Sequence, residues 1–368
     1  MLAIGVAASA ALWPPCSGWR GCYLLLHRIE NGQSNTDQYR KVLVDHFAAS
    51  ADKFAFSVLM ADSRSVGMIV ADRHSGVSRL ISESGAHLGQ PYFSTDGRRF
   101  LLVRARYDSP QRQLLSCQIA TWQCEVVVQT GDTIMFPVEI DAGTILYASS
   151  PMRIAVDGRK LYQTYDFYIA RTGGEPARLS NYRLYELGWL SVVAGKIVFG
   201  AEAAPGNPVL PRRTLHPAAI YAVKFDDRKL EILPVALPLT PIFQMDTISI
   251  RPAMSPDGQR VAFLNVESVK GRYHYNMAVA SLDGAIQHYV KVEGIFLSHG
   301  AFVGDKLFFG ELFKDHYRVR QLDLKQGTVD DVLTFDYSAQ TLEKLEPISL
   351  RINDGARSAL RRSSTLPN

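Results

Sequence analysis

One turn motif, present in two copies, constrains the fold of this chain more than any other feature. It reads Ser255-Pro256-Asp257-Gly258 and is followed by an apolar run, Val261 to Leu264. Proline supplies the φ of the second position of a type I turn, aspartate caps its own backbone, and glycine accepts a left-handed conformation. The motif therefore predicts a tight reversal between two antiparallel strands. The second copy reads Ser94-Thr95-Asp96-Gly97 and precedes Phe100 to Val103.

The same unit recurs in weaker form along the chain. Six apolar runs lack the polar alternation of a half-exposed strand, which predicts strands buried on both faces. They are Phe54 to Phe56, Phe100 to Val103, Ile145 to Ala148, Ile197 to Gly200, Val261 to Leu264 and Leu307 to Gly310. The turns before them lie roughly 44 to 63 residues apart, and four strands per unit of about that length are typical of propeller blades. The sequence therefore predicts an all-β fold, a six-bladed β-propeller with four-stranded antiparallel blades.

The chain divides into three expected segments. Residues 1–22 are an apolar leader, residues 23–352 form a single propeller, and residues 353–368 are a basic tail without apolar periodicity, which predicts disorder. Strands are expected at 23–29 and within 342–352. One of these two is expected to close the ring by joining a blade from the other end of the chain.

The beginning of the sequence and two cysteines indicate export. Leu2 to Trp13 has the length of a signal-peptide apolar region and is too short to cross a bilayer core of roughly 30 Å, so no transmembrane helix is expected. It lacks a preceding basic stretch, and a leaderless cytoplasmic protein is the alternative. Cys117 and Cys124 flank a short turn between two expected strands, and a disulfide there would require an oxidising compartment. Two unpaired cysteines packed as small apolar residues are the other reading. We predict a periplasmic or extracellular protein.

The turn motif with the apolar run after it resembles the WD40-like repeat of TolB-type six-bladed propellers, which also occurs in the propeller domains of prolyl oligopeptidase relatives. The full motif covers two of the six units, Pro91 to Val103 and Pro252 to Leu264. Elsewhere the turn departs from it, because Ile140 to Gly143 lacks Ser-Pro and Val303 to Asp305 inverts the order. The resemblance implies a six-bladed ring that is frequently periplasmic and frequently a protein-binding scaffold. It implies no catalytic residue.

Several enzyme and ligand classes find no support in the sequence. The chain contains no G-x-S-x-G elbow, which the peptidase relatives carry on a separate hydrolase domain, and no P-loop or dinucleotide-binding glycine pattern. A formal charge of +4 is too small to indicate nucleic-acid binding. We therefore expect no cofactor and no nucleic-acid partner.

Two groups of residues are candidates for binding. His87, Arg251 and His299 lead into inner strands of three blades, so they are expected at the mouth of the central channel. Two neutral imidazoles could hold a divalent ion there, but exposed or hydrogen-bonded loop histidines are far commoner, and no metal site is predicted. Arg212 and Arg213 lie in a long loop at 201–217, and an equivalent loop carries Arg104, Arg106 and Arg112. Such basic loops favour an acidic protein surface or an anionic glycan, although they are also consistent with a merely solvated surface.

These features predict a non-catalytic, exported binding or scaffold module that contacts a protein or cell-envelope component through its loop-bearing face. The alternative is a lyase or hydrolase that acts on an anionic carbohydrate at the channel mouth, with His87, Arg251 and His299 in the site. The sequence predicts neither the oligomeric state nor the identity of the partner.

Overall fold

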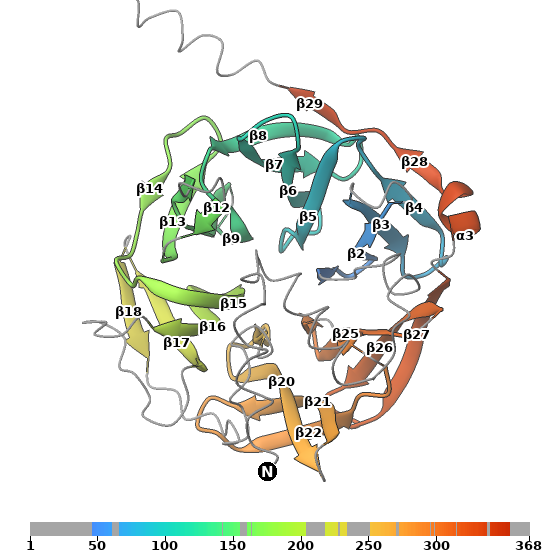
Figure 1. Cartoon of the computed structure of the whole chain (residues 1–368). Helices are drawn as coiled ribbons and strands as arrows, with labels where there is room; N and C mark the ends of the chain where they lie inside the picture. The colour runs from blue at the N-terminus through green and yellow to red at the C-terminus, as the bar shows by residue number, and fades with distance from the viewer. Residues whose placement is uncertain are drawn as a thin grey trace, which may run out of the picture.

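A ring of small antiparallel sheets surrounds a central axis (Figure 1). The computed structural model describes residues 46–60, 66–141, 143–154, 160–162, 164–203, 218–226, 229–233, 251–269, 272–294, 296–297, 299–313, 315–336 and 339–353. The expected leader, the expected strand at 23–29 and the tail after residue 353 lie outside the described residues.

The first two blades share one sheet of ten strands that divides at a single bridge, Val66 to His87. Within each blade the strands pair in chain order from the axis outward, as short turns dictate for antiparallel neighbours. Blade 1 contains β1 (Phe47–Ala49), β2 (Lys53–Leu59), β3 (Val66–Asp72) and β4 (Ser78–Ile81). Blade 2 contains β5 (Ala86–Phe93), β6 (Arg99–Arg106), β7 (Arg112–Gln118) and β8 (Gln123–Thr130).

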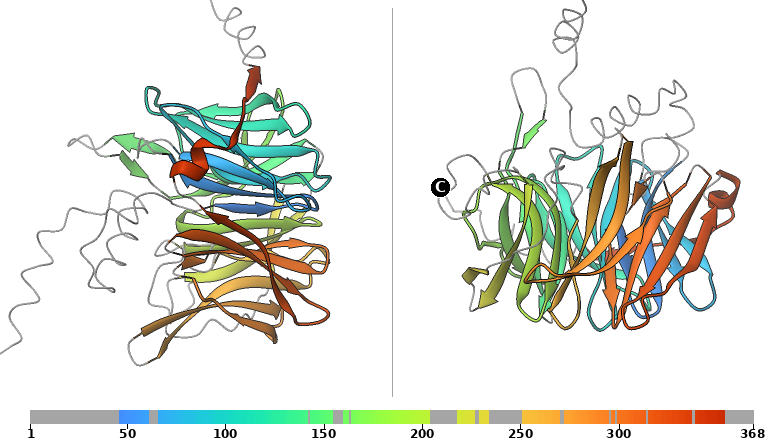
Figure 2. Two further views of the ribbon diagram at one scale, coloured as in Figure 1. Left: turned by 90° about the vertical axis from the view of Figure 1, so that its right-hand side faces the viewer. Right: turned by 90° about the horizontal axis from the view of Figure 1, so that it is seen from below.

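Blades 3 and 4 are separate four-stranded sheets. Blade 3 contains β9 (Met135–Asp141), β10 (Thr144–Ser149), β13 (Asp166–Arg171) and β14 (Ala177–Arg178). Its middle connection, expected as a plain loop, carries the two-stranded hairpin of β11 (Met152–Ile154) and β12 (Lys160–Tyr162), which projects from one face of the ring (Figure 2). Blade 4 contains β15 (Leu184–Val193), β16 (Lys196–Ala203), β17 (Ala218–Asp226) and β18 (Lys229–Leu233).

Blades 5 and 6 complete the ring. In blade 6 two short strands, β23 and β24, share the inner position, because both pair with β25. Blade 5 contains β19 (Ala253–Met254), β20 (Arg260–Val269), β21 (Arg272–Ser281) and β22 (Ile286–Lys291). Blade 6 contains β23 (Phe296–Leu297), β24 (Ala301–Val303), β25 (Lys306–Leu312), β26 (His316–Asp323) and β27 (Val329–Asp336).

Six apolar clusters hold the blades together, one at each contact between neighbours. The cluster between blades 6 and 1 includes Phe54, Phe56 and Phe308, so the last blade packs directly on the first. Each of the six apolar runs expected from the sequence lies in the second strand of its blade and is buried on both faces. The predicted propeller fold with four-stranded antiparallel blades is confirmed.

The Ser-x-Asp-Gly turns are closed by their own side chains. Ser255 Oγ donates to Asp257 Oδ1 at 2.5 Å and accepts a bond from the Arg260 backbone amide at 2.9 Å. Asp257 Oδ1 also accepts from the Gln259 amide at 3.0 Å. The turn at Ser94 repeats this pattern with Asp96. Serine and aspartate thus supply acceptors for backbone amides that the reversal leaves unpaired, which explains the preference for these residues.

Acid is expected to weaken both turns. Hydrogen bonds from Ser94 and Ser255 lower the pKa of Asp96 and Asp257 below the usual 3.8, so ionisation stabilises the fold. Their contribution is present above about pH 4 and is lost as the pH falls through the lowered folded-state pKa values. An Asp96→Asn, Asp257→Asn variant should therefore lose less unfolding free energy than the wild type between about pH 5 and pH 2.5 in urea titrations. Asp330→Asn, which alters an exposed carboxylate of β27, is the control, and superimposable acid profiles of all three proteins would contradict the prediction.

A disulfide joins β7 and β8. Cys117 and Cys124 are cross-strand neighbours, their sulfur atoms are 2.06 Å apart, and both residues are buried. The predicted bridge is therefore present in the outer hairpin of blade 2. Trp122, in the turn between the two cysteines, adopts a left-handed φ of 55° and packs edge-on against Phe100.

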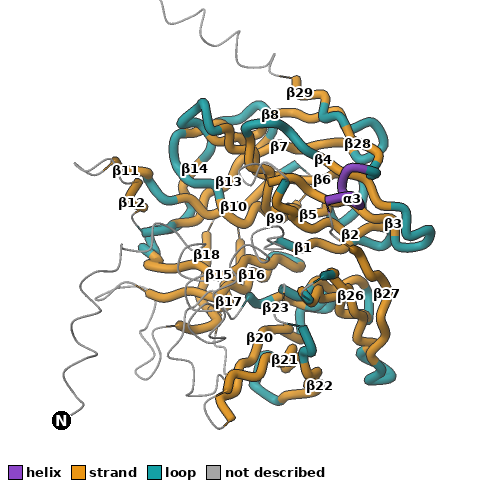
Figure 3. The backbone as a smooth tube through the Cα atoms, turned by 45° about the vertical axis from the view of Figure 1, so that its right-hand side comes forward, coloured by secondary structure: helices purple, strands orange, loops and turns teal. Residues whose placement is uncertain are grey.

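A strap of chain follows blade 6 and runs outside blades 1 and 2 (Figure 1). It comprises α3 (Ala339–Glu343), β28 (Glu346–Ile348) and β29 (Arg351–Asn353), and Figure 3 shows α3 as a short helix at the rim. β28 adds in parallel to β4, and β29 adds in parallel to β8. The C-terminal segment thus adds strands to blades from the other end of the chain, but it does not complete a blade to close the ring, because blades 1 and 2 each have four strands without it. The prediction of a single strand within 342–352 is also wrong. The strap is divided because its two short strands pair with edges that belong to two different blades.

Candidate functional site

The inner strands of several blades are distorted at the same level, close to the axis. Gln90, Phe136 and Arg251 have φ values of 58°, 51° and 34°, in the left-handed region that residues other than glycine rarely adopt. The pairing of β5 with β6 shifts register around Gln90, and that of β9 with β10 shifts near Phe136. Such bulges re-aim side chains and concentrate at functional sites. The distorted inner strands therefore mark the part of the propeller around the axis as a candidate site.

One buried glutamine connects the bulges of blades 2 and 3. The side-chain carbonyl of Gln90 accepts a hydrogen bond from the backbone N–H of Phe136, and its amide nitrogen lies 3.1 Å from Met135 Sδ. Gln90 is 8% exposed. Because a buried amide needs its hydrogen-bond partners, this contact fixes both inner strands relative to each other.

Aromatic and histidine rings from four blades meet beside these bulges. Trp189 of β15 stacks on His299, with ring centroids 3.5 Å apart, and lies 4.8 Å from the ring of Phe136. The ring of His46, just before β1, lies 6.0 Å from Trp189. His46 Nδ1 is 3.3 Å from the hydroxyl of Ser57, which is fully buried and therefore orients the ring. We call His46, Trp189, Arg251 and His299 the axial cluster.

The axial cluster holds one permanent charge next to a neutral imidazole. Burial lowers the pKa of His299 well below 6.5, and the positive charge of Arg251 and the nearby His46 lower it further, against a hydrogen bond with the Phe47 backbone. His299 is therefore uncharged at neutral pH, whereas the Arg251 guanidinium keeps its charge. Both residues are 4% exposed. The cluster therefore places a guanidinium beside an uncharged ring in a largely buried position.

The sequence predicted His87, Arg251 and His299 at the channel mouth, and the structure brings two of them together. Arg251 and His299 interact electrostatically in the axial cluster. His87 of β5 lies near His46: a methyl group on Gly89 would lie 3.1 Å from His87 Nε2 and 3.5 Å from His46 Nδ1. Glycine at this position thus leaves room for both imidazoles.

Other members of the site had no signal in the sequence. His46 and Trp189 sit in ordinary strand-like stretches, and the approach of Trp189 to His299 accompanies a register shift between Leu187 and Leu190 of β15. Arg212 and Arg213, the candidates in the long loop, lie outside the described residues. Among the described residues, no group of three or more His, Cys, Asp or Glu side chains is arranged to hold a metal ion.

The described loop between β6 and β7 is less basic than its sequence indicates. Arg104 is held by Glu83 through two bonds of 2.7 and 2.6 Å, and Arg106 pairs with Asp108 at 2.5 Å. These arginines are neutralised locally, so the expected excess of positive charge is absent at this loop. Tyr107, which lies between them in sequence, is 56% exposed. None of the helices among residues 46–353 that the structure describes could span a bilayer.

Comparisons with known proteins identify the fold. No family model and no curated protein matches the sequence. TolB from Acinetobacter baumannii has a similar structure, with 12% identity and a TM-score of 0.53, covering 84% of this chain and 68% of that chain. The β-propeller domain of the Trilobed protease from Pyrococcus furiosus is 14% identical, with a TM-score of 0.43, and the match covers 80% of this chain and 85% of that domain.

A third similar structure belongs to a longer protein. Pyrococcus horikoshii acylaminoacyl peptidase is 14% identical, with a TM-score of 0.47, and the match covers 79% of this chain but 46% of the peptidase. At such identities the likeness establishes the architecture and leaves the activity open. The chain folds as a β-propeller similar to that of TolB.

Proposed function

We propose that this protein is an exported, non-catalytic binding module that contacts a protein of the cell envelope through its loop-bearing face. The observation that carries the proposal is the axial cluster. His46 precedes β1, Arg251 precedes β19, and His299 lies between β23 and β24, so the cluster joins the inner strands of blades 1, 5 and 6. Because these side chains are buried, they support the loops of this face, and exposed loop residues such as Tyr107 supply the contact surface for a macromolecule.

Two features support export. The Cys117–Cys124 disulfide fits an oxidising compartment, because cytosolic thiols are kept reduced. The expected leader at residues 1–22 fits the same destination. TolB, to which the fold is similar, adds no argument about location at 12% identity.

Capture of partners from envelope extract tests the proposal. Tyr107→Ala alters an aromatic residue on the loop-bearing face, and Arg212→Glu with Arg213→Glu reverses two charges in the loop expected at 201–217. Each variant is expected to reduce capture of at least one protein roughly tenfold, the size of effect that exposed aromatic and arginine anchors produce.

Val77→Ser is the matched control. Val77 is 58% exposed and lies in the turn between β3 and β4, on the opposite face of the ring. Wild type and control are expected to capture the same proteins. An identical set for all four proteins would remove the loop-bearing face from consideration.

The alternative function is a lyase or hydrolase for an anionic carbohydrate, with His87, Arg251 and His299 in the site. It is favoured by the approach of the Arg251 guanidinium to the uncharged imidazole of His299, since such groups bind a carboxylate and exchange protons. Incubation with polyuronates should then release shorter or unsaturated chains, and a His299→Ala variant should not. Lack of any product with the wild type would exclude this alternative for those substrates.

A further inference from the structure

One corner of the contact between blades 2 and 3 is polar instead of apolar. Nearer the loop-bearing face, Val103 and Leu114 of blade 2 belong to the same apolar cluster as Ile145 and Tyr147 of blade 3. At the opposite end of the same sheet, close to the hairpin turns, polar residues take their place. Blade contacts are normally sealed by apolar side chains, so this corner requires a separate explanation.

The polar residues form two rows on one face of the sheet. Arg99 of β6 is opposite Gln118 of β7, and Gln123 of β8 is opposite Arg351 of β29. In the second row, Glu125 of β8 lies between its neighbours Ser116 and Asn353. Side chains alternate along a strand, so these residues share the face toward blade 3. The strap thus extends the polar floor to four strands, or about 14 Å across.

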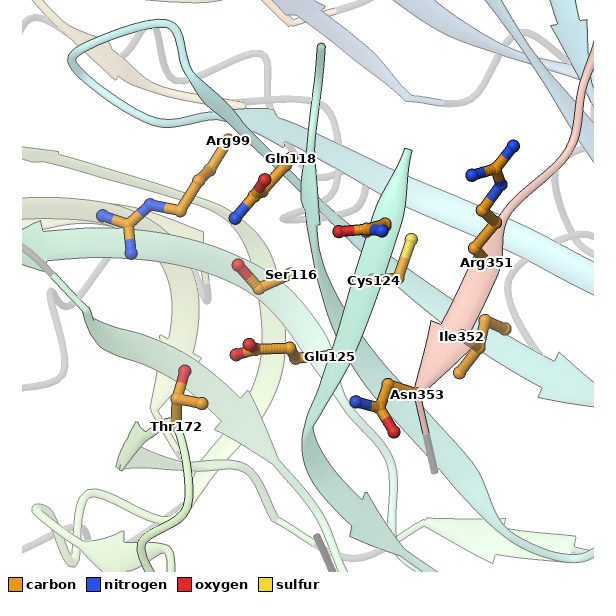
Figure 4. A pocket seen from close by; sticks show the side chains of 10 residues that line it. Arg99, Ser116, Gln118, Cys124, Glu125, Thr172, Arg351, Ile352 and Asn353 are labelled. Carbon is orange, nitrogen blue, oxygen red and sulfur yellow. The ribbon is translucent and has the colours of Figure 1, made fainter. Parts of the chain in front are cut away.

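A cavity of about 540 Å³ lies over this floor, with Thr172 of the blade 3 turn at its other side. Figure 4 shows Arg99, Ser116, Gln118 and Glu125 on the same side, toward Thr172. The cavity exists because the outer strand of blade 3, β14, has 2 residues, whereas β8 has 8. We call this cavity the strap groove.

The strap groove is polar but electrically balanced. Arg99 is ion-paired with Glu139, and the charge of Arg351 is offset by that of Glu125 in the same floor. Amide, hydroxyl and carboxylate groups together offer both donors and acceptors over the floor. Cys124 and Ile352, which alternate with the polar residues, pack on the opposite face of the sheet, and none of the described residues that line the groove is aromatic.

We propose that the strap groove binds an uncharged oligosaccharide. Sugar hydroxyls both donate and accept hydrogen bonds, which matches side chains that do the same in rows. A nucleic acid would need several uncompensated cations and stacking aromatic rings, and a drug-like apolar ligand would need a mostly apolar lining. A peptide strand would bind by pairing with the backbone of an open sheet edge or by inserting apolar side chains into pockets. This floor offers neither, because it is formed by polar side chains on the face of a sheet.

An array of neutral and acidic oligosaccharides tests the proposal, followed by calorimetric titration of the strongest neutral binder. The wild type is expected to bind at least one neutral chain. Gln118→Ala and Glu125→Ala should each lower the affinity roughly fivefold, the effect of one lost hydrogen bond. Thr172→Trp should lower it more than about tenfold, because the indole would fill the cavity from the far wall without altering the floor.

Gln287→Ala, on the exposed outer strand of blade 5, is the control and should bind like the wild type. All three groove residues are at least partly exposed, so unchanged melting temperatures should show that the variants are folded. The proposal is overturned if no neutral oligosaccharide binds, if binding is confined to acidic ones, or if Thr172→Trp binds as well as the wild type. These outcomes are independent of partner capture by the loop-bearing face.

Discussion

Replacing Glu311 with alanine is expected to lower the free energy of unfolding by about 3–5 kcal/mol. Glu311 of β25 is fully buried and accepts hydrogen bonds from Arg318 at 2.6 Å and Arg320 at 3.1 Å. Removal of the Glu311 carboxylate would leave the guanidinium groups of Arg318 and Arg320 without the buried negative charge that both of them contact. Urea unfolding followed by circular dichroism measures the loss.

Two further variants distinguish the cost of leaving buried guanidinium groups unpaired from the simple loss of side-chain contacts. Asp331→Asn removes an outer partner of the same arginines, whose side chain is 52% exposed, and should cost less than about 1 kcal/mol. Glu311→Leu combined with Arg318→Met and Arg320→Met replaces the whole buried group by apolar side chains and should recover most of the stability. A loss below about 1 kcal/mol in Glu311→Ala would show that the network is not buried as described.

Phe308→Ala is expected to destabilise the protein by about 3–5 kcal/mol, because it opens a cavity where the ring closes. Phe308 is fully buried between blades 6 and 1, with its ring centroid 5.3 Å from that of Phe54 and 4.2 Å from the guanidinium carbon of Arg73. Urea unfolding measures the change. Val332→Ala, at a 36% exposed position of β27, should change it by less than about 0.5 kcal/mol.

The comparison of these two variants also tests the closed ring. If blades 6 and 1 are in contact as described, Phe308→Ala is much the more damaging of the two. Equal, small effects on the free energy of unfolding would mean that the contact between blades 6 and 1 contributes little to stability. Such a result would contradict a ring closed by the packing of these two blades.

Local chemistry made most of the blade architecture predictable. The turn at Ser255–Gly258 and the apolar runs such as Phe100 to Val103 depend on interactions within a few residues, and they formed as expected. The strap was not predictable in the same way. Its short strands pair with strands from the first two blades, as in the bond between Arg79 and Glu346, which are 267 residues apart. Nothing local to residues 346–353 specifies those partners.

The candidate site was predictable in part for a related reason. The positions of His87, Arg251 and His299 at the entry to expected inner strands were enough to predict them as candidate site residues. Trp189 was missed because its approach to His299 depends on a bulge in β15, and bulges at residues other than glycine leave no reliable mark in a sequence. The polar rows of the strap groove were missed because they require the register of four strands.

The strap has a consequence for how the molecule behaves among its copies. β28 and β29 occupy the backbone groups at the edges of β4 and β8, which would otherwise stay available to any passing strand. A chain that ended before α3 would keep all four strands of every blade, but the outer edges of β4 and β8 would be left open to pairing with another chain. The last residues of the described chain thus cover two sheet edges that another chain could otherwise pair with, in addition to adding Leu342 and Ile348 to the core.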